Sequence, residues 1–156
     1  MARPKGHSGR SRVREKPAAE YAAPSTPAGL SGVLLDSDII IQVLRGYSDP
    51  TEELSRLERA GVPTYATAIA WAEVHASLRR GEEPAALEFL RARGEVVLDT
   101  RTGRVAGDYL ARFRCSHAVE LADALVAAAA TTSGLHLWTL NRKHFPMPDL
   151  RLYEPE

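Results

Sequence analysis

Three carboxylates and one carboxamide stand where predicted strands end or predicted helices begin: Asp36, Glu73, Asp123 and Asn141. Asp36 directly follows the apolar run 33–35, and Asn141 follows the run 136–140. Glu73 lies in the first turns of a predicted helix. In an open parallel sheet, ligands bind beyond the carboxyl ends of the strands. Carboxylates that converge there from separate elements favour a hard cation such as Mg²⁺ or Mn²⁺.

Asp123 carries the most weight, because it interrupts a predicted helix over 119–133 that is otherwise apolar and rich in alanine. Burial of a carboxylate is costly unless the group is paired or ligates a metal. No Lys or Arg occurs between Arg114 and Arg142, so no basic side chain on this helix neutralises it. The sequence therefore predicts that Asp123 ligates a cation.

Each of these residues also has a purely structural interpretation. Asp36 could be a loop residue or a helix N-cap, and Glu73 could be the solvated flank of an amphipathic helix. Asn141, which follows a strand, is favoured as a turn residue when taken alone. Asp38 is interpreted as a helix cap rather than as a ligand. Only the convergence of several such residues on one edge of a sheet favours a site.

Other kinds of site receive little support. The five histidines show no metal-ligand spacing, and Cys115, the single cysteine, cannot complete a structural zinc site. The chain has no glycine-rich phosphate loop of the Walker or dinucleotide-binding type. Trp71 and Trp138 are predicted to lie in the core rather than to stack on bases.

The elements that must position the site alternate between strand and helix. Apolar runs predict strands over 33–35, 63–67, 95–99 and 136–140, the third of them buried. Helical spacing and glycine stops predict helices over 39–45, 51–60, 69–80, 83–93, 101–114 and 119–133. This alternation predicts an α/β domain with a mostly parallel central sheet flanked by helices.

Composition separates a basic amino-terminal tail from the predicted domain. The chain has 156 residues, of which 44% are hydrophobic and 26% charged, as expected for one globular domain. We predict a disordered, proline-rich tail over 1–31 and the folded domain over 32–156. The first 30 residues hold six basic and two acidic side chains, which leaves 14 basic and 18 acidic residues for the rest. An acidic domain suits nucleic acid only if bound cations convert its site into one that accepts phosphate.

The cellular setting is predicted from absences in the sequence. No apolar run reaches the roughly 18 residues that a membrane-spanning helix needs, and the basic amino terminus lacks the apolar core of a secretory signal. A single cysteine fits a reducing compartment. We therefore expect a cytoplasmic protein without a membrane partner.

Four blocks of the chain resemble PIN domains, in the order in which that family carries them. They are LLDSDIII from residue 34, TAIAWAEV from residue 67, LADALVAAA from residue 121 and LWTLNRKHF from residue 137. The aspartate that opens an alanine-rich helix is the most specific of the four. The resemblance covers essentially the whole predicted domain. The compact size of this domain is similar to that of VapC-type toxins.

The resemblance implies a Mg²⁺- or Mn²⁺-dependent endoribonuclease, the toxin component of a toxin–antitoxin pair. Asp36 and Asp123 would be the main metal ligands, with Glu73 binding directly or through water. Many family members carry a fourth acidic residue where this chain has Asn141, which puts a stable second metal in doubt. RNA as substrate, a VapB-like antitoxin as partner and a homodimer are implied by the same resemblance. A PIN-like RNA-binding or interaction module without activity is the alternative, and a DNA or flap nuclease is a second rival.

Overall fold

The computed structural model describes residues 30–156, and the central feature of this part of the chain is a four-stranded sheet. Its strands are β1 (Val33–Leu35), β2 (Thr64–Thr67), β3 (Gly94–Val96) and β4 (His136–Trp138). All neighbouring strands pair in parallel, in the order β3-β2-β1-β4. The predicted α/β class with a parallel sheet is therefore confirmed. The predicted tail over 1–31 lies almost entirely outside the described residues.

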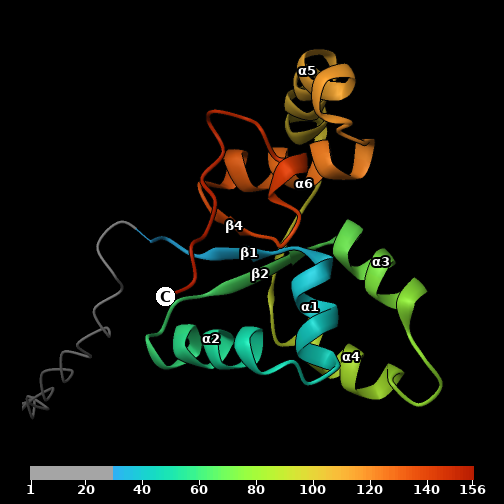
Figure 1. Ribbon diagram of the computed structural model, residues 1–156, viewed down its shortest axis with the longest axis vertical. Coiled ribbons are helices and arrows are strands. Elements are labelled where there is room, and N and C mark those ends of the chain that lie inside the picture. The colour runs from blue at the N-terminus through green and yellow to red at the C-terminus, as the bar shows by residue number, and fades with distance from the viewer. Residues whose placement is uncertain (1–29) are drawn as a thin grey trace, which may run out of the picture.

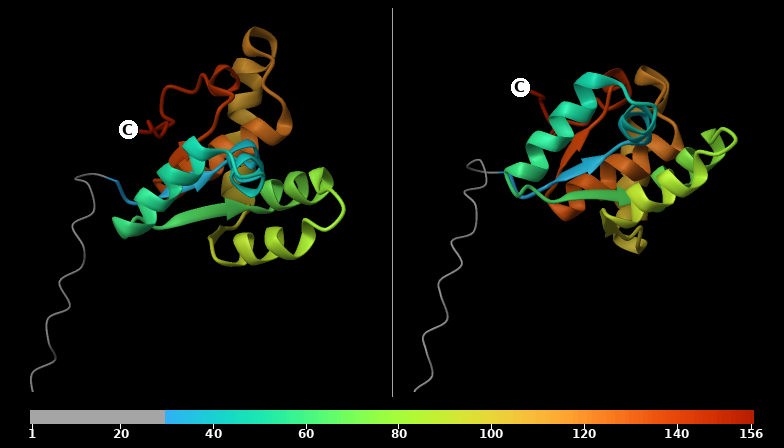
Figure 2. Two further views of the ribbon diagram at one scale, coloured as in Figure 1. Left: turned by 60° about the horizontal axis from the view of Figure 1, so that its bottom comes forward. Right: turned by 90° about the horizontal axis from the view of Figure 1, so that it is seen from below.

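Six α-helices and one short 3-10 helix complete the described part of the chain. They are α1 (Ser37–Leu44), α2 (Ser48–Arg59), α3 (Ala68–Ser77), α4 (Glu83–Arg91), α5 (Thr100–His117), α6 (Leu121–Ser133) and η1 (Arg142–His144). Figures 1 and 2 show α5 and α6 on one side of the sheet and α1 to α4 on the other. Two buried apolar clusters fill the two interfaces, as expected for a sheet covered on both faces. No helix in the described range is both long and apolar enough to cross a bilayer.

Alanine-rich α6 packs closely because its side chains are small. Ala124 and the run from Ala127 to Ala130 are completely buried, and α6 has its most extensive contacts with α5. Gly134 ends the helix with a φ of +67°, a left-handed conformation in which glycine has no Cβ penalty. The small side chains of α6 thereby allow it to pack closely against α5.

Most predicted elements are present, but the third strand differs from its prediction. The run 95–99 was expected to form a buried strand, whereas β3 covers Gly94–Val96 and only Val96 of these is buried. Val97 is 68% exposed. The prediction of a buried strand is wrong because β3 lies at an edge of the sheet, where it pairs only with β2.

The chain end covers the opposite edge of the sheet. Leu152 pairs with Leu137 of β4 as an isolated parallel bridge. The Leu137 amide donates to the Arg151 carbonyl at 2.8 Å, and the Tyr153 amide donates to the Leu137 carbonyl at the same distance. The backbone of Leu137 is therefore paired on its outer side.

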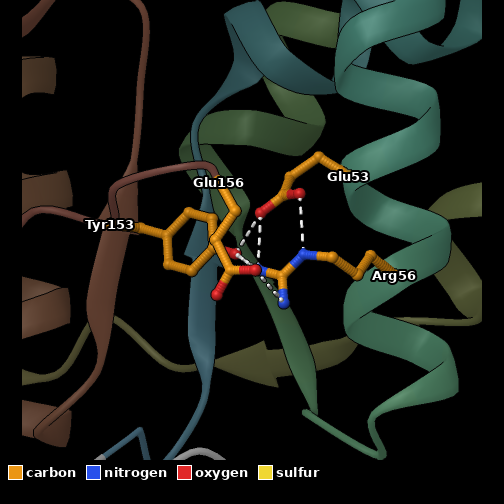
Figure 3. A network of polar contacts seen from close by, with 4 residues as sticks. All are labelled: Glu53, Arg56, Tyr153 and Glu156. Carbon is orange, nitrogen blue, oxygen red and sulfur yellow. Dashed lines mark hydrogen bonds and ion pairs between the residues drawn. The ribbon is translucent and has the colours of Figure 1, made fainter.

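Side-chain contacts fix this carboxy-terminal segment to α2 (Figure 3). Arg56 forms a two-point ion pair with Glu53, with both N···O distances at 2.9 Å, and donates to the Tyr153 hydroxyl at 2.8 Å. The Tyr153 hydroxyl also donates to Glu53, and Arg56 lies 3.4 Å from Glu156. Burial raises the pKa of Tyr153 far above its ordinary value, so the phenol stays protonated and acts as a donor.

Candidate active site at the carboxyl edge of the sheet

Asp36 joins β1 to α1 and is held in place by backbone contacts on both sides. Its amide donates to the Trp138 carbonyl at 3.0 Å, which ties it to the end of β4. Its side chain caps α1 by accepting from the Ser37 amide at 2.9 Å. Asp36 is thus the helix N-cap, a role that satisfies one orphan donor of the helix terminus.

The electrostatic environment of Asp36 opposes its ionisation. Burial is the main cause and the Asp38 charge the next, with a smaller effect from Glu73, and together they raise the pKa of Asp36 to about 6. Hydrogen bonds from Thr139 and Ser37 act in the opposite direction but do not outweigh burial. A carboxylate in such surroundings gains from a bound cation, which would compensate both the lost solvent and the neighbouring charges.

Asp38 does not cap the helix, so its interpretation as a helix cap is wrong. Its side chain reaches instead across to the segment after β4. Asp38 Oδ2 accepts from the Leu140 amide at 3.0 Å and from the Thr139 hydroxyl at 3.3 Å. Burial raises the pKa of Asp38 despite these donors. Its second oxygen, Oδ1, is buried and has no hydrogen-bond partner among the described residues.

Glu73 projects from α3 toward the start of α1. The Ser37 hydroxyl donates to Glu73 Oε2 at 2.6 Å, which fixes the direction of an otherwise exposed side chain. The helix itself begins at the end of β2, where the Thr67 hydroxyl accepts from the Ala70 amide at 3.3 Å. Figure 1 shows β1 leading into α1 and β2 leading into α3 at one end of the sheet. The structure therefore brings Glu73 to the same edge as Asp36.

Asp123 lies in the first turn of α6, and its environment differs from the one predicted. Its Oδ2 accepts from the Glu120 amide at 2.9 Å, as part of a capping box at the helix start. His144 Nδ1 lies 3.4 Å from the same oxygen, and the Asp123 side chain is 20% exposed. The carboxylate therefore has a backbone donor and a histidine beside it, so its cost of burial is smaller than the apolar sequence implied.

Thr139 and Asn141 lie beyond the end of β4, as predicted for Asn141. The Thr139 hydroxyl accepts from the Asn141 amide at 3.1 Å, donates to Asp38 Oδ2 at 3.3 Å and lowers the pKa of Asp36. A hydroxyl has one proton, so it donates to only one of the two carboxylates at a time. Asn141 makes no side-chain capping bond to η1, which follows it.

Of the four predicted residues, Asp36, Glu73 and Asn141 are connected through shared neighbours, whereas Asp123 is not. Asp36 and Glu73 share one electrostatic neighbourhood, and Thr139 connects Asp36 and Asp38 to Asn141. Asp123 has contacts to Glu120 and His144, but among the described residues it forms no hydrogen bond or ion pair with Asp36 or Glu73. Over residues 30–156, no three or more His, Cys, Asp or Glu side chains form a group arranged to hold a metal ion. The three predicted carboxylate ligands are therefore not assembled in this arrangement of side chains.

The chemistry of the edge nevertheless fits a hard divalent cation. All its donors are oxygens, as Mg²⁺ and Mn²⁺ prefer, and one buried carboxylate oxygen, that of Asp38, has no partner. None of the five ion pairs found in the described part of the chain involves Asp36, Asp38 or Glu73. Because no basic side chain of residues 30–156 forms an ion pair with them, these three carboxylates leave a charge that a cation would neutralise.

Two contacts of the site were not predicted from the sequence. The role of Asp38 was missed, although its place two residues after Asp36, in the first turn of the helix that follows the strand, was a usable signal. The pairing of His144 with Asp123 was missed as well. Its signal was weaker, since only the position of His144 shortly after Asn141 suggested that it would be near the site.

Comparison with known proteins identifies the family. The PIN domain model matches residues 33–147, so the chain belongs to the PIN domain family. Ribonuclease VapC10 of Mycobacterium tuberculosis is 34% identical over 116 residues, which cover 74% of this chain and 86% of that protein. Ribonuclease VapC19 of the same species is 32% identical over 120 residues, covering 76% of this chain and 96% of that protein.

Solved structures share the fold at lower sequence identity. VapBC2 from Rickettsia felis, bound to a DNA fragment from its promoter, matches with a TM-score of 0.67 and 18% identity, covering 80% of this chain and 98% of that one. DNA-bound VapBC from Salmonella typhimurium matches with a TM-score of 0.66 and 21% identity, covering 80% and 98%. At these identities the likeness establishes the fold alone.

Proposed function

We propose that this protein is a divalent-metal-dependent endoribonuclease of the VapC type, the toxin component of a toxin–antitoxin pair. The observation that carries the proposal is the uncompensated carboxylate group at the carboxyl edge of the sheet, where the pKa of Asp36 is raised to about 6. The named activity of the M. tuberculosis relatives supports RNA as the substrate.

In the proposed mechanism, Asp36 and Asp123 are the main ligands of Mg²⁺ or Mn²⁺, and Glu73 binds directly or through water. Such a cation would supply positive charge to the scissile phosphate and activate a water molecule for in-line attack. Ser37 orients Glu73, and Thr139 orients the Asn141 backbone at the same edge. Attack by water rather than by the ribose 2′-hydroxyl leaves 5′-phosphate and 3′-hydroxyl ends.

Phosphate contacts are assigned to Arg142 and Lys143, which directly follow Asn141 in η1. Both side chains are exposed. Arg142 donates to Glu154 at 2.7 Å, and a guanidinium that binds a carboxylate in this way has the geometry to bind a phosphate instead. RNA would therefore have to displace a surface ion pair, which is a small cost.

The proposed partner is a VapB-like antitoxin whose peptide lies across the carboxyl edge of the sheet and directs a basic side chain to the carboxylates. A cavity of about 730 Å³ between α1, α2 and the chain end supports this proposal. Its lining includes Ile39, Trp138 and Leu140, next in sequence to Asp38 and Thr139. Leu140 is 52% exposed, so an apolar partner side chain would gain by covering it. The homodimer implied by the family resemblance belongs to the same proposal.

The decisive experiment is a cleavage assay on the purified, antitoxin-free protein with structured RNA, with Mg²⁺ or Mn²⁺, and with EDTA. We expect cleavage only with the metals, and none by the Asp36→Asn/Asp123→Asn variant. Cleavage that persists in EDTA would contradict the proposed chemistry. Parallel incubation with DNA oligonucleotides separates a ribonuclease from a DNA nuclease.

A second candidate function is an RNA-binding or interaction module without activity. It is favoured by one observation, namely that within the described residues the carboxylates do not form a ready three-ligand metal group. RNA binding without cleavage of any RNA pool, by well-folded protein that also fails to bind Mn²⁺, would favour this function over the nuclease.

A further inference from the structure

Asp38 is placed to act on the same edge of the sheet as Asp36, although no part of the proposed mechanism uses it. It lies in the first turn of α1, two residues after the N-cap Asp36, and its side chain is partly buried. Asp38 Oδ2 accepts from the Thr139 hydroxyl at 3.3 Å, and the Asp36 amide donates to the carbonyl of Trp138, the residue before Thr139, at 3.0 Å.

One oxygen of Asp38 has a structural role that is already satisfied. Oδ2 accepts from the Leu140 amide and the Thr139 hydroxyl, and the Thr139 hydroxyl in turn accepts from the Asn141 amide. This chain of contacts fixes the segment after β4 against the first turn of α1. A neutral carboxamide at position 38 would have one oxygen to accept from the Leu140 amide, so this role does not by itself call for a carboxylate.

A purely structural role does not explain why the other oxygen of Asp38 is buried without a partner. Oδ1 is buried and unpartnered among the described residues, and an unsatisfied buried acceptor destabilises the fold, the more so when it is charged. No ion pair in residues 30–156 includes Asp38 or Asp36, so no basic side chain offsets the charge. A cation at this edge would offset it, because carboxylate oxygens are preferred ligands of Mg²⁺ and Mn²⁺.

We propose that Asp38 is a further acidic residue of the cation site, which it serves with Oδ1 while Oδ2 anchors the segment after β4. The inference rests on the proposed function, since it assigns a residue to the metal site invoked there. It predicts that the negative charge at position 38, and not only its hydrogen bonds, contributes to metal affinity.

The test compares Mn²⁺ binding by the full-length wild type and by Asp38→Asn, with free Mn²⁺ measured by electron paramagnetic resonance. Asparagine keeps an acceptor for the Leu140 amide but removes the charge. We expect Asp38→Asn to bind Mn²⁺ at least tenfold more weakly, and to gain less in melting temperature than the wild type on addition of Mn²⁺. In EDTA we expect the melting temperature of Asp38→Asn to be no lower than that of the wild type. Such a result would show that the variant folds. Asp108→Asn, on an exposed position of α5, is the matched control and should bind as the wild type does.

A charge-transfer variant sharpens the test. The Asn141 amide donates to the same Thr139 hydroxyl that donates to Asp38, so Asp38→Asn/Asn141→Asp moves one negative charge from one neighbour of that hydroxyl to the other. We expect the double variant to recover Mn²⁺ affinity to within about threefold of the wild type. Asp38→Asn with unchanged Mn²⁺ affinity would overturn the inference, as would a wild type that binds no Mn²⁺.

The two levels of proposal fail in different ways. If the wild type binds Mn²⁺ and loses that affinity on Asp38→Asn but cleaves no RNA, the inference stands and the proposed nuclease activity fails. If the wild type cleaves RNA with Mn²⁺ and Asp38→Asn neither binds nor cleaves differently, the nuclease stands and the inference fails.

Discussion

At the residue scale, the candidate site holds neighbouring carboxylates whose burial and mutual repulsion destabilise their charged forms. Asp36 has a pKa of about 6 because it is buried beside Asp38 and, to a lesser degree, Glu73. Raised carboxyl pKa values of this kind are common at functional sites, although structural carboxylates show them too. Removing one of these charges should therefore cost function while improving the stability of the metal-free protein.

The first prediction follows from the sign of this shift. A carboxyl whose folded-state pKa lies above its unfolded value binds more protons in the folded state between the two values. In EDTA, the free energy of unfolding should thus fall as pH rises from about 4 through about 6, by up to about 3 kcal/mol from this group. Asp36→Asn should flatten that decline and melt higher than the wild type at pH 8. Urea unfolding at several pH values measures the free energy of unfolding, and thermal unfolding at pH 8 compares the melting temperatures. A variant that melts lower than the wild type at pH 8 would contradict the argument.

The second prediction concerns Asp123. Asp123→Asn should reduce metal-dependent RNA cleavage at least 100-fold while leaving the fold intact, since the carboxamide oxygen still accepts from the Glu120 amide at the start of α6. Circular dichroism and the melting temperature report the fold, and the exposed Asp108→Asn serves as the control for activity. Normal turnover by Asp123→Asn would sink its assignment as a ligand.

A third prediction separates orientation from ligation at Glu73. Ser37→Ala removes the 2.6 Å hydrogen bond that directs Glu73 but leaves every carboxylate in place. Cleavage should fall by about 3- to 30-fold, less than for Glu73→Gln, because orientation and charge are lost together only in the latter. Steady-state rates at saturating Mg²⁺ provide the comparison. Equal losses in the two variants would mean that Ser37 does more than orient Glu73.

At the element scale, the edge strand β3 depends on a glycine. Gly94 pairs with Tyr65 of β2, and a Cβ built on Gly94 would lie 2.4 Å from the Tyr65 ring. Gly94→Ala should therefore destabilise the protein by about 1–3 kcal/mol, because the aromatic ring must move out of a packed position. Urea denaturation measures the loss, and Gly103→Ala on α5, where the added Cβ meets nothing within 4 Å, is the control.

Local patterns predicted the elements well, whereas long-range contacts limited the rest. Glycine stops and apolar runs identified the helices and strands to within a few residues, and placed Asp36 and Asn141 at strand ends. The edge position of β3 depends on the order of strands, which no local pattern encodes. The role of Asp38 depends on Leu140, 102 residues further along the chain. The metal-ligand assignment of Asp36, Glu73 and Asp123 stays a prediction.

At the scale of the whole molecule, the carboxy-terminal segment contributes to stability through a buried polar contact. Glu53 is 7% exposed and is bonded to both Arg56 and the Tyr153 hydroxyl. Tyr153→Phe should lower the free energy of unfolding by about 1–3 kcal/mol, because it removes a donor from a buried carboxylate. Tyr47→Phe, at a position that is 56% exposed, should have little effect. Thermal unfolding of the two variants compares them directly.

The carboxy-terminal segment Arg151–Tyr153, which pairs along β4, also affects the tendency of the protein to aggregate. Open strand edges present unpaired backbone groups that recruit strands from other molecules. On this sheet, β3 limits that risk by being three residues long with an exposed Glu95, and β4 is covered by the chain end. Detachment of the segment would uncover the apolar strand His136–Trp138 on its outer side. Heated or carboxy-terminally weakened protein should accordingly aggregate through β4, and light scattering during a melt would detect it before the helices are lost.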